Sequence, residues 1–109
     1  MWFAARVTHR LMVQYGQPTD PDAFDQHYRD VHIPLTRKVP GLVRFTIARP
    51  TALGGGEAPY LVAELDWESA ESFGGAMQSA ENQAAGADLA NFATGGVTLS
   101  HFDVEDVTS

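Results

Sequence analysis

The sequence predicts an α+β fold in which two helices cover one face of a four-stranded antiparallel sheet. Four segments have the period-two alternation or the β-rich composition of strands, and two regions have apolar residues at helical spacing. These segments follow one another in the order β-α-β-β-α-β. The chain has 109 residues, the size of one domain, so we expect residues 1–109 to form a single domain with its core at about 6–104.

The first predicted strand runs from Arg6 to Tyr15, because its apolar residues alternate with polar ones. The segment Met1–Ala5 is predicted to be a short tail or an extension of this strand. The first helix is predicted to begin at Pro21, since Asp20 is a good N-cap residue and proline fits the first helical position.

The first predicted helix carries a narrow apolar stripe at steps of four, three and four residues: Phe24, Tyr28, Val31 and Leu35. Positive charge in the last turn and the pair Pro40-Gly41 then end it. Pro34 has no N–H, so the carbonyl of Asp30 loses its usual helical partner. The helix is therefore expected to kink or end near His32.

After the first helix, the predicted elements follow in the order strand, strand, helix, strand. The two strands Leu42–Arg49 and Tyr60–Trp67 are joined by a glycine-rich connection, which lacks the Lys-Ser/Thr of a phosphate-binding loop. Ser69 is placed to cap a second helix, a further helical stretch covers about 80–93, and Gly95-Gly96 ends it. The last predicted strand is Val97–Val104.

This order of elements is the ferredoxin-like, split βαβ arrangement. Both helices cover the same face of the sheet, and nothing else in the chain is available to cover the other face. A second copy of the chain is the simplest cover, so we expect a homodimer in which two sheets face one another.

Composition narrows the range of possible partners. Fourteen acidic residues against seven basic ones give a net charge of −7, which disfavours nucleic acid and anionic membrane surfaces. The chain has no cysteine, so disulfides and thiolate metal sites are impossible, and we expect a cytoplasmic protein. No apolar run approaches the roughly 20 residues of a membrane span.

The stretch YGQPTDPDAFDQHYRDVHIPLTRKVPGL resembles the opening of the EthD family, and YLVAELDW and ADLANFATGGV resemble its later part. The matching features in the first stretch are Tyr15, Pro18, Asp20-Pro21, Phe24, Tyr28, His32, Pro34-Leu35 and Pro40-Gly41. The resemblance runs from about Arg10 to Val104 and implies a dimeric α+β barrel. Family members are associated with degradation of ethers and aromatics and with polyketide tailoring. The broader fold includes cofactor-free cyclases, decarboxylases, isomerases and monooxygenases, and fold alone does not choose among them.

His32 and Tyr15 are the predicted catalytic residues. A histidine titrates near neutral pH and can take and give a proton. The matching family position, rather than helical geometry, selects His32 over His27, which is expected at the surface. Tyr15 is placed to polarise a carbonyl oxygen. The alternatives are that His32 caps the broken helix or packs against Tyr28, and that Tyr15 is a core residue.

The predicted substrate-binding residues are mostly aromatic or apolar and would line a cavity suited to an apolar ligand: Tyr28, Trp67, Phe73, Met77, Phe92 and His101. Core packing is the alternative for each of them, and His9 is a weaker candidate. Glu64 and Asp66 share a strand face and are expected to be exposed or dimer-facing. No metal is expected, because His27 and His32 are five residues apart and cannot share one helical face.

The function that the sequence favours is a cofactor-independent enzyme that transfers protons on a small aromatic or polyketide-like carbonyl compound. Cyclisation, dehydration, isomerisation and decarboxylation all fit, so the reaction class stays open. The first alternative is a non-catalytic carrier of an apolar small molecule. The second is a haem-binding barrel, which a Soret band on purification would reveal.

Overall fold

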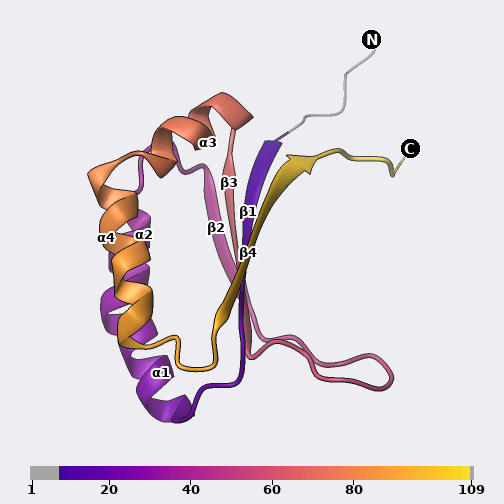
Figure 1. The fold of residues 1–109 in the computed structure, drawn as a ribbon. Helices are drawn as coiled ribbons and strands as arrows, with labels where there is room; N and C mark the ends of the chain where they lie inside the picture. The colour runs from indigo at the N-terminus through magenta and orange to yellow at the C-terminus, as the bar shows by residue number, and fades with distance from the viewer. Residues whose placement is uncertain (1–7, 109) are drawn as a thin grey trace.

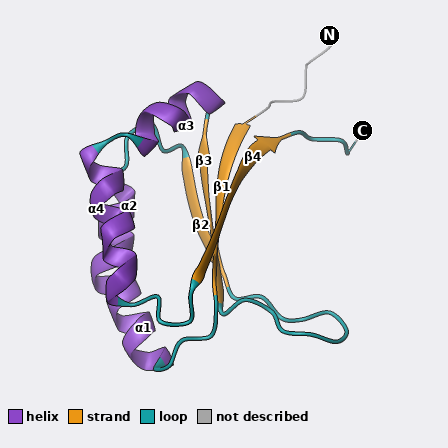
Figure 2. Ribbon diagram, viewed as in Figure 1, coloured by secondary structure: helices purple, strands orange, loops and turns teal. Residues whose placement is uncertain are grey.

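The computed structural model describes residues 8–108 and contains one four-stranded antiparallel sheet in the order β2-β3-β1-β4. Met1–Ala5 and the first two residues of the predicted first strand lie outside the described residues. The helices form a layer on one face of the sheet (Figures 1 and 2). The elements are β1 (Thr8–Tyr15), α1 (Pro21–His27), the π-helical segment η1 (Tyr28–His32), α2 (Ile33–Arg37), β2 (Arg44–Ala48), β3 (Leu61–Trp67), α3 (Ala70–Met77), α4 (Ala80–Asp88), the 3-10 segment η2 (Leu89–Asn91) and β4 (Val97–Val104).

The strands pair in the register that the alternating pattern requires. In the central strand β1, Val13 lies opposite Ala63 of β3 and Leu99 of β4. The apolar face of β3 is buried from end to end, and its residues are Leu61, Ala63, Leu65 and Trp67. The predicted order of elements and the bounds of β4 are confirmed, whereas β2 is shorter than the predicted strand.

The core between sheet and helices is rich in aromatic side chains. Tyr15, Tyr28 and Trp67 are each at most 2% exposed. The Trp67 ring is also anchored, because its Nε1–H donates a hydrogen bond of 2.9 Å to the carbonyl of Pro40. Aromatic residues from β1, α1, η1 and the segment after η2 meet at one end of this core: Tyr15, Phe24, Tyr28 and Phe92.

Helix α1 begins where the sequence predicts. The Asp20 carboxylate accepts a hydrogen bond of 3.1 Å from the backbone N–H of Ala23, and Pro21 is the first helical residue. Ser69 caps α3 in the same way by accepting from the N–H of Ser72 at 3.0 Å. Both predicted caps are therefore confirmed.

Removal of the α1 cap gives a testable stability effect. Asp20→Ala is expected to lower the free energy of unfolding by ~1 kcal/mol, because the Ala23 N–H loses its acceptor. Urea denaturation measures the change, and Glu57→Ala in the exposed β2–β3 connection serves as the control. An Asp20→Ala protein with an unchanged unfolding midpoint would contradict the role of this cap.

The helix departs from regular geometry at the predicted place, between Asp30 and Pro34. The N–H of Ile33 donates to the carbonyl of Tyr28, five residues back, so the turn is a π-turn. This turn is wider than an α-turn and brings positions four residues apart onto one face. The predicted stripe is therefore wrong at Val31, which is 39% exposed, whereas Phe24, Tyr28, His32 and Thr36 face inward and are buried.

The face of the sheet away from the helices carries a charged cluster. The Arg10 guanidinium binds the Asp66 carboxylate with both Nε at 2.7 Å and Nη2 at 3.1 Å, and its Nη1 lies 3.0 Å from Glu64. Asp66 is only 6% exposed, so of the two expectations for this pair, exposed or dimer-facing, the first is wrong for Asp66. The register with Arg10 explains its burial, because the two residues are direct partners across β1 and β3.

None of the helices in residues 8–108 is long and apolar enough to cross a membrane.

Candidate functional site

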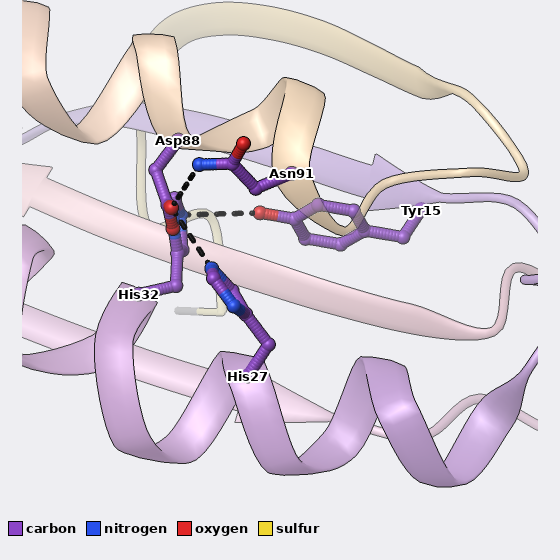
Figure 3. A network of polar contacts seen from close by, with 5 residues as sticks. All are labelled: Tyr15, His27, His32, Asp88 and Asn91. Carbon is purple, nitrogen blue, oxygen red and sulfur yellow. Dashed lines mark hydrogen bonds and ion pairs between the residues drawn. The ribbon is translucent and has the colours of Figure 1, made fainter.

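A buried polar network lies between the sheet and the helices at the π-turn. It joins Tyr15 of β1, His32 at the end of η1, Asp88 at the end of α4, and the flanking side chains His27 and Asn91 (Figure 3). The π-turn explains why His32 joins this network, since it turns His32 from the flank of the helix toward the sheet.

The hydrogen bonds of the His32 ring define its chemistry. Its Nδ1 lies 2.9 Å from Asp88 Oδ2, and its Nε2 lies 3.5 Å from the Tyr15 hydroxyl oxygen. An ionised carboxylate only accepts hydrogen bonds, so we assign the proton of the neutral ring to Nδ1. This tautomer leaves the lone pair of Nε2 directed toward Tyr15, ready to accept a proton.

Two opposing effects set the pKa of His32: the burial of its ring and the nearby negative charge of Asp88. The residue is 6% exposed, and the Phe92 ring packs on it with ring centroids 4.7 Å apart. This burial lowers the pKa of His32, and the hydrogen bond and charge of Asp88 only partly oppose the shift. The ring is therefore neutral near pH 7, as a general base requires.

Asp88 is the centre of the network. Its Oδ1 accepts from His27 Nε2 at 2.8 Å and from Asn91 Nδ2 at 3.0 Å, while its Oδ2 faces His32. Burial works to raise the pKa of Asp88, but the hydrogen bonds from Asn91, His27 and His32 outweigh it and hold the pKa below its usual value. The carboxylate therefore stays charged and orients the His32 ring.

Two buried phenols face the same space as His32. Burial raises the pKa of both Tyr15 and Tyr28, so each remains a protonated hydrogen-bond donor. The two hydroxyls perturb each other's pKa, yet the Tyr28 oxygen has no hydrogen-bond partner among the described residues. An unpaired buried hydroxyl costs about 1–3 kcal/mol, which a ligand oxygen at this position would relieve.

A cavity of about 70 Å³ adjoins these groups. Its polar wall includes Tyr15, Tyr28 and His32, and most of the remaining lining is apolar. Leu99 of β4 lines the cavity and is 53% exposed, so the cavity reaches solvent beside this edge strand. A small carbonyl group placed here would meet one base and two hydroxyl donors.

The structure divides the six predicted substrate-binding residues between the two ends of the sheet. Tyr28 lines the cavity, and Phe92 packs against the His32 ring from outside the lining. Trp67, Phe73, Met77 and His101 are not part of the lining. The rings of Trp67 and Phe73 pack edge to face, and His101 stacks on Phe73.

His9 lies in the same cluster as Phe73 and His101. Its Nε2 is 2.9 Å from His101 Nδ1, and its Nδ1 is 2.8 Å from Asp103 Oδ1.

His27 corrects a sequence expectation. It was expected at the surface, but its side chain is only 27% exposed and its ring stacks on Phe92 with centroids 5.2 Å apart. Sequence reasoning missed Asp88 altogether. The available signal was its place on the helical face of Ala85, Leu89 and Phe92, where a carboxylate among apolar residues needs a partner.

Within residues 8–108, no group of three or more histidine or carboxylate side chains is arranged to hold a metal ion.

The lowered pKa of His32 predicts how stability depends on pH. Between the folded pKa and the unfolded value of about 6.5, the unfolded state binds more protons, so stability rises with pH. The free energy of unfolding is therefore expected to fall as pH drops below about 6.5, by at most about 1.4 kcal/mol per pH unit from this residue. Urea denaturation from pH 7.5 to 5 measures the slope. His32→Gln should flatten it, and equal slopes in the two proteins would contradict the assignment.

The fold and the site together define a class: a ferredoxin-like α+β domain with a buried histidine–carboxylate pair beside a small cavity. The chain belongs to the EthD family, since the model of the EthD domain matches residues 16–96. This match begins one residue after β1 and ends one residue before β4, and it includes every residue of the polar network except Tyr15.

Two relatives are similar over nearly their whole length. A protein of 11.0 kDa from Rhodococcus erythropolis, encoded between thcB and thcC and described as uncharacterised, is 42% identical over 100 residues, which are 91% of this chain and 97% of that one. The crystal structure of an EthD family protein from Bacillus halodurans is 38% identical with a TM-score of 0.80, covering 87% of this chain and 96% of that one.

More distant structures share the fold alone. A dimeric ferredoxin-like protein of unknown function from Thermobifida fusca is 13% identical, with a TM-score of 0.68 and coverage of 95% of this chain and 97% of that one. SnoaB from Streptomyces nogalater, a cofactor-independent oxygenase, is 17% identical, with a TM-score of 0.59 and 97% of each chain covered. The predicted ferredoxin-like, dimeric-barrel type of fold is confirmed.

Proposed function

We propose that this protein is a cytoplasmic, cofactor-independent enzyme that transfers a proton on a small aromatic or polyketide-like carbonyl compound. His32 is the general base and acid, and Tyr15 donates a hydrogen bond to the carbonyl oxygen. The observation that carries the proposal is the buried His32 ring, which Asp88 holds at Nδ1 while Nε2 faces Tyr15 beside the cavity. SnoaB, of the same fold, is a cofactor-independent oxygenase, which is a precedent for cofactor-free chemistry on this scaffold.

The reaction begins with proton abstraction next to a carbonyl group. Tyr15 turns its hydroxyl from Nε2 to the carbonyl oxygen, which is a small change because their contact of 3.5 Å is a weak hydrogen bond. Nε2 of His32 then takes the α-proton, the C–H electron pair forms the enolate, and the negative charge moves to the carbonyl oxygen. Hydrogen bonds from Tyr15 and from the unpaired Tyr28 hydroxyl stabilise this oxygen.

Asp88 stabilises the imidazolium that forms on His32, because its carboxylate stays charged. Return of the proton to a different atom isomerises the substrate. Donation of the proton to a leaving β-hydroxyl, which departs as water, gives dehydration. Attack of the enolate carbon on a second carbonyl converts it to an alkoxide, which takes the proton from His32, and gives cyclisation. Each outcome uses the same base and the same oxygen site.

The cavity limits the size of the reacting group. A volume of about 70 Å³ is well below the roughly 300 Å³ at which pockets for drug-sized ligands begin. We therefore expect only the reacting carbonyl end to enter, while the rest of the substrate lies at the mouth against the half-exposed Leu99. The apolar lining favours an aromatic or alkyl substituent over a charged one.

The test is deuterium exchange in D2O, with a panel of small aryl ketones and β-dicarbonyl compounds observed by NMR. The wild-type protein should accelerate exchange at the α-carbon, and His32→Gln should reduce the rate about 100-fold or more. Arg37→Gln, at the exposed end of α2, is the matched control and should retain exchange. Ligands that raise the melting temperature of both proteins without exchange in either would favour a carrier instead.

We propose that the working form is a homodimer in which the two open sheet faces meet. On this face, Phe102 is 37% exposed and lies beside the Arg10 cluster as the direct cross-strand partner of Arg10. The interface should bury about 2,000 Å² or more in total, as obligate interfaces do. Light scattering at micromolar concentration should give about twice the chain mass, and a well-folded monomer would contradict this assembly.

A further inference from the structure

We propose that His27 is a positioning residue for His32, acting through the Asp88 carboxylate that the two histidines share. His27 binds Oδ1 of Asp88 at 2.8 Å and His32 binds Oδ2 at 2.9 Å, so one negative charge serves two imidazoles (Figure 3). The proposed function gives this arrangement its effect on turnover, but the arrangement is testable without any substrate.

The two histidines of the network differ in their exposure to solvent. The His27 side chain is 27% exposed, whereas those of His32 and Asp88 are 8% and 5% exposed. The His27 ring is therefore partly open to solvent, while the His32 ring is covered by Phe92 and reaches only the cavity. The His27 ring also stacks on Phe92, which fixes the ring where it can donate to Asp88.

Charge sharing follows from this geometry. When His27 is neutral, the Asp88 charge is available to stabilise an imidazolium at His32. When His27 is protonated, it already neutralises that carboxylate, and a second positive charge at His32 would be buried without compensation. A proton on His27 thus opposes protonation of His32 and keeps its Nε2 available as a base.

The other titratable groups around the pair do not replace His27 in this role. Tyr15 and Tyr28 face His32 from β1 and η1, and both are protonated, neutral phenols. Asn91, the remaining partner of Asp88, donates without carrying charge. Among the described residues with side chains bonded to Asp88, His27 is therefore the only one besides His32 whose side chain can carry a positive charge.

The experiment follows the imidazole resonances of His32 by NMR from pH 4 to 8 in three proteins: wild type, His27→Gln and His27→Phe. Glutamine keeps a hydrogen-bond donor but no charge. Phenylalanine keeps the ring against Phe92 but has neither donor nor charge. We expect the midpoint for His32 to rise by about one pH unit in His27→Gln, and further in His27→Phe, because the carboxylate then serves His32 alone.

Asp22→Asn, which removes an exposed charge from the same helix, is the matched control and should leave the midpoint unchanged. An unchanged His32 midpoint in both His27 variants, with the fold intact by circular dichroism, would overturn the inference. This result is separate from the deuterium-exchange test, since the titration needs no turnover. A protein that shows the shifts but no exchange with any compound would refute the proposed function and leave the coupling established.

Discussion

Asp88→Asn is expected to reduce α-proton exchange about 100-fold or more while the protein remains folded. The Asp88 carboxylate accepts hydrogen bonds from His32, His27 and Asn91. An asparagine amide accepts at one end only and donates at the other. If the amide N–H₂ faces His32, Nδ1 must become the acceptor and the ring proton moves to Nε2, where it blocks proton abstraction. General base catalysis by the ring is then lost.

The tautomer itself can be measured. Nitrogen-15 chemical shifts distinguish the protonated from the unprotonated ring nitrogen, so the wild-type His32 should show a protonated Nδ1 and the variant a protonated Nε2. Asp25→Asn is the matched control, because Asp25 is an aspartate of α1 paired with Arg49 and Tyr60 away from the network. Full exchange activity in Asp88→Asn would exclude Asp88 as the residue that orients His32.

Much of the fold could be predicted because its signals are local. The alternation in Val97–Val104 and the Asp20 and Ser69 caps depend on residues within a few positions of one another, and the structure has them where expected. Pro34 similarly predicted the break in the helix, since a missing N–H is a property of one residue. The form of the break was not predictable in this way, because a π-turn depends on packing against the sheet.

The candidate site could be predicted only in part, because its central contact joins distant segments. Asp88 lies 56 residues after His32, and no periodicity connects the two. The family resemblance identified His32, while the ideal-helix geometry placed it beside the apolar stripe rather than within it. The π-turn removed that discrepancy, and it also explains why Val31 is exposed although its spacing is helical.

Phe92→Ala is expected to lower the free energy of unfolding by about 3–5 kcal/mol. Phe92 is 4% exposed, and its ring lies within 6 Å, between centroids, of five others: Tyr15, Phe24, His27, Tyr28 and His32. Removing it leaves a void where α1, η1 and β1 meet. For a domain with about 5–15 kcal/mol of total stability this is a large loss, and urea denaturation should detect it readily.

The same substitution tests what keeps the His32 ring neutral. Water entering the void would hydrate the imidazolium, so the pKa of His32 should rise toward its ordinary value in Phe92→Ala. Phe92→Leu fills most of the volume and should keep the low pKa, losing only the aromatic contacts, worth about 0.5–1.5 kcal/mol for each favourable pair. Because the leucine protein stays well folded, the NMR titration of His32 remains measurable even if the alanine protein unfolds. A His32 midpoint at about 6.5 in the wild type and in Phe92→Leu would mean that burial does not set its pKa, and the assignment of His32 as a neutral base near pH 7 would then lose its physical cause.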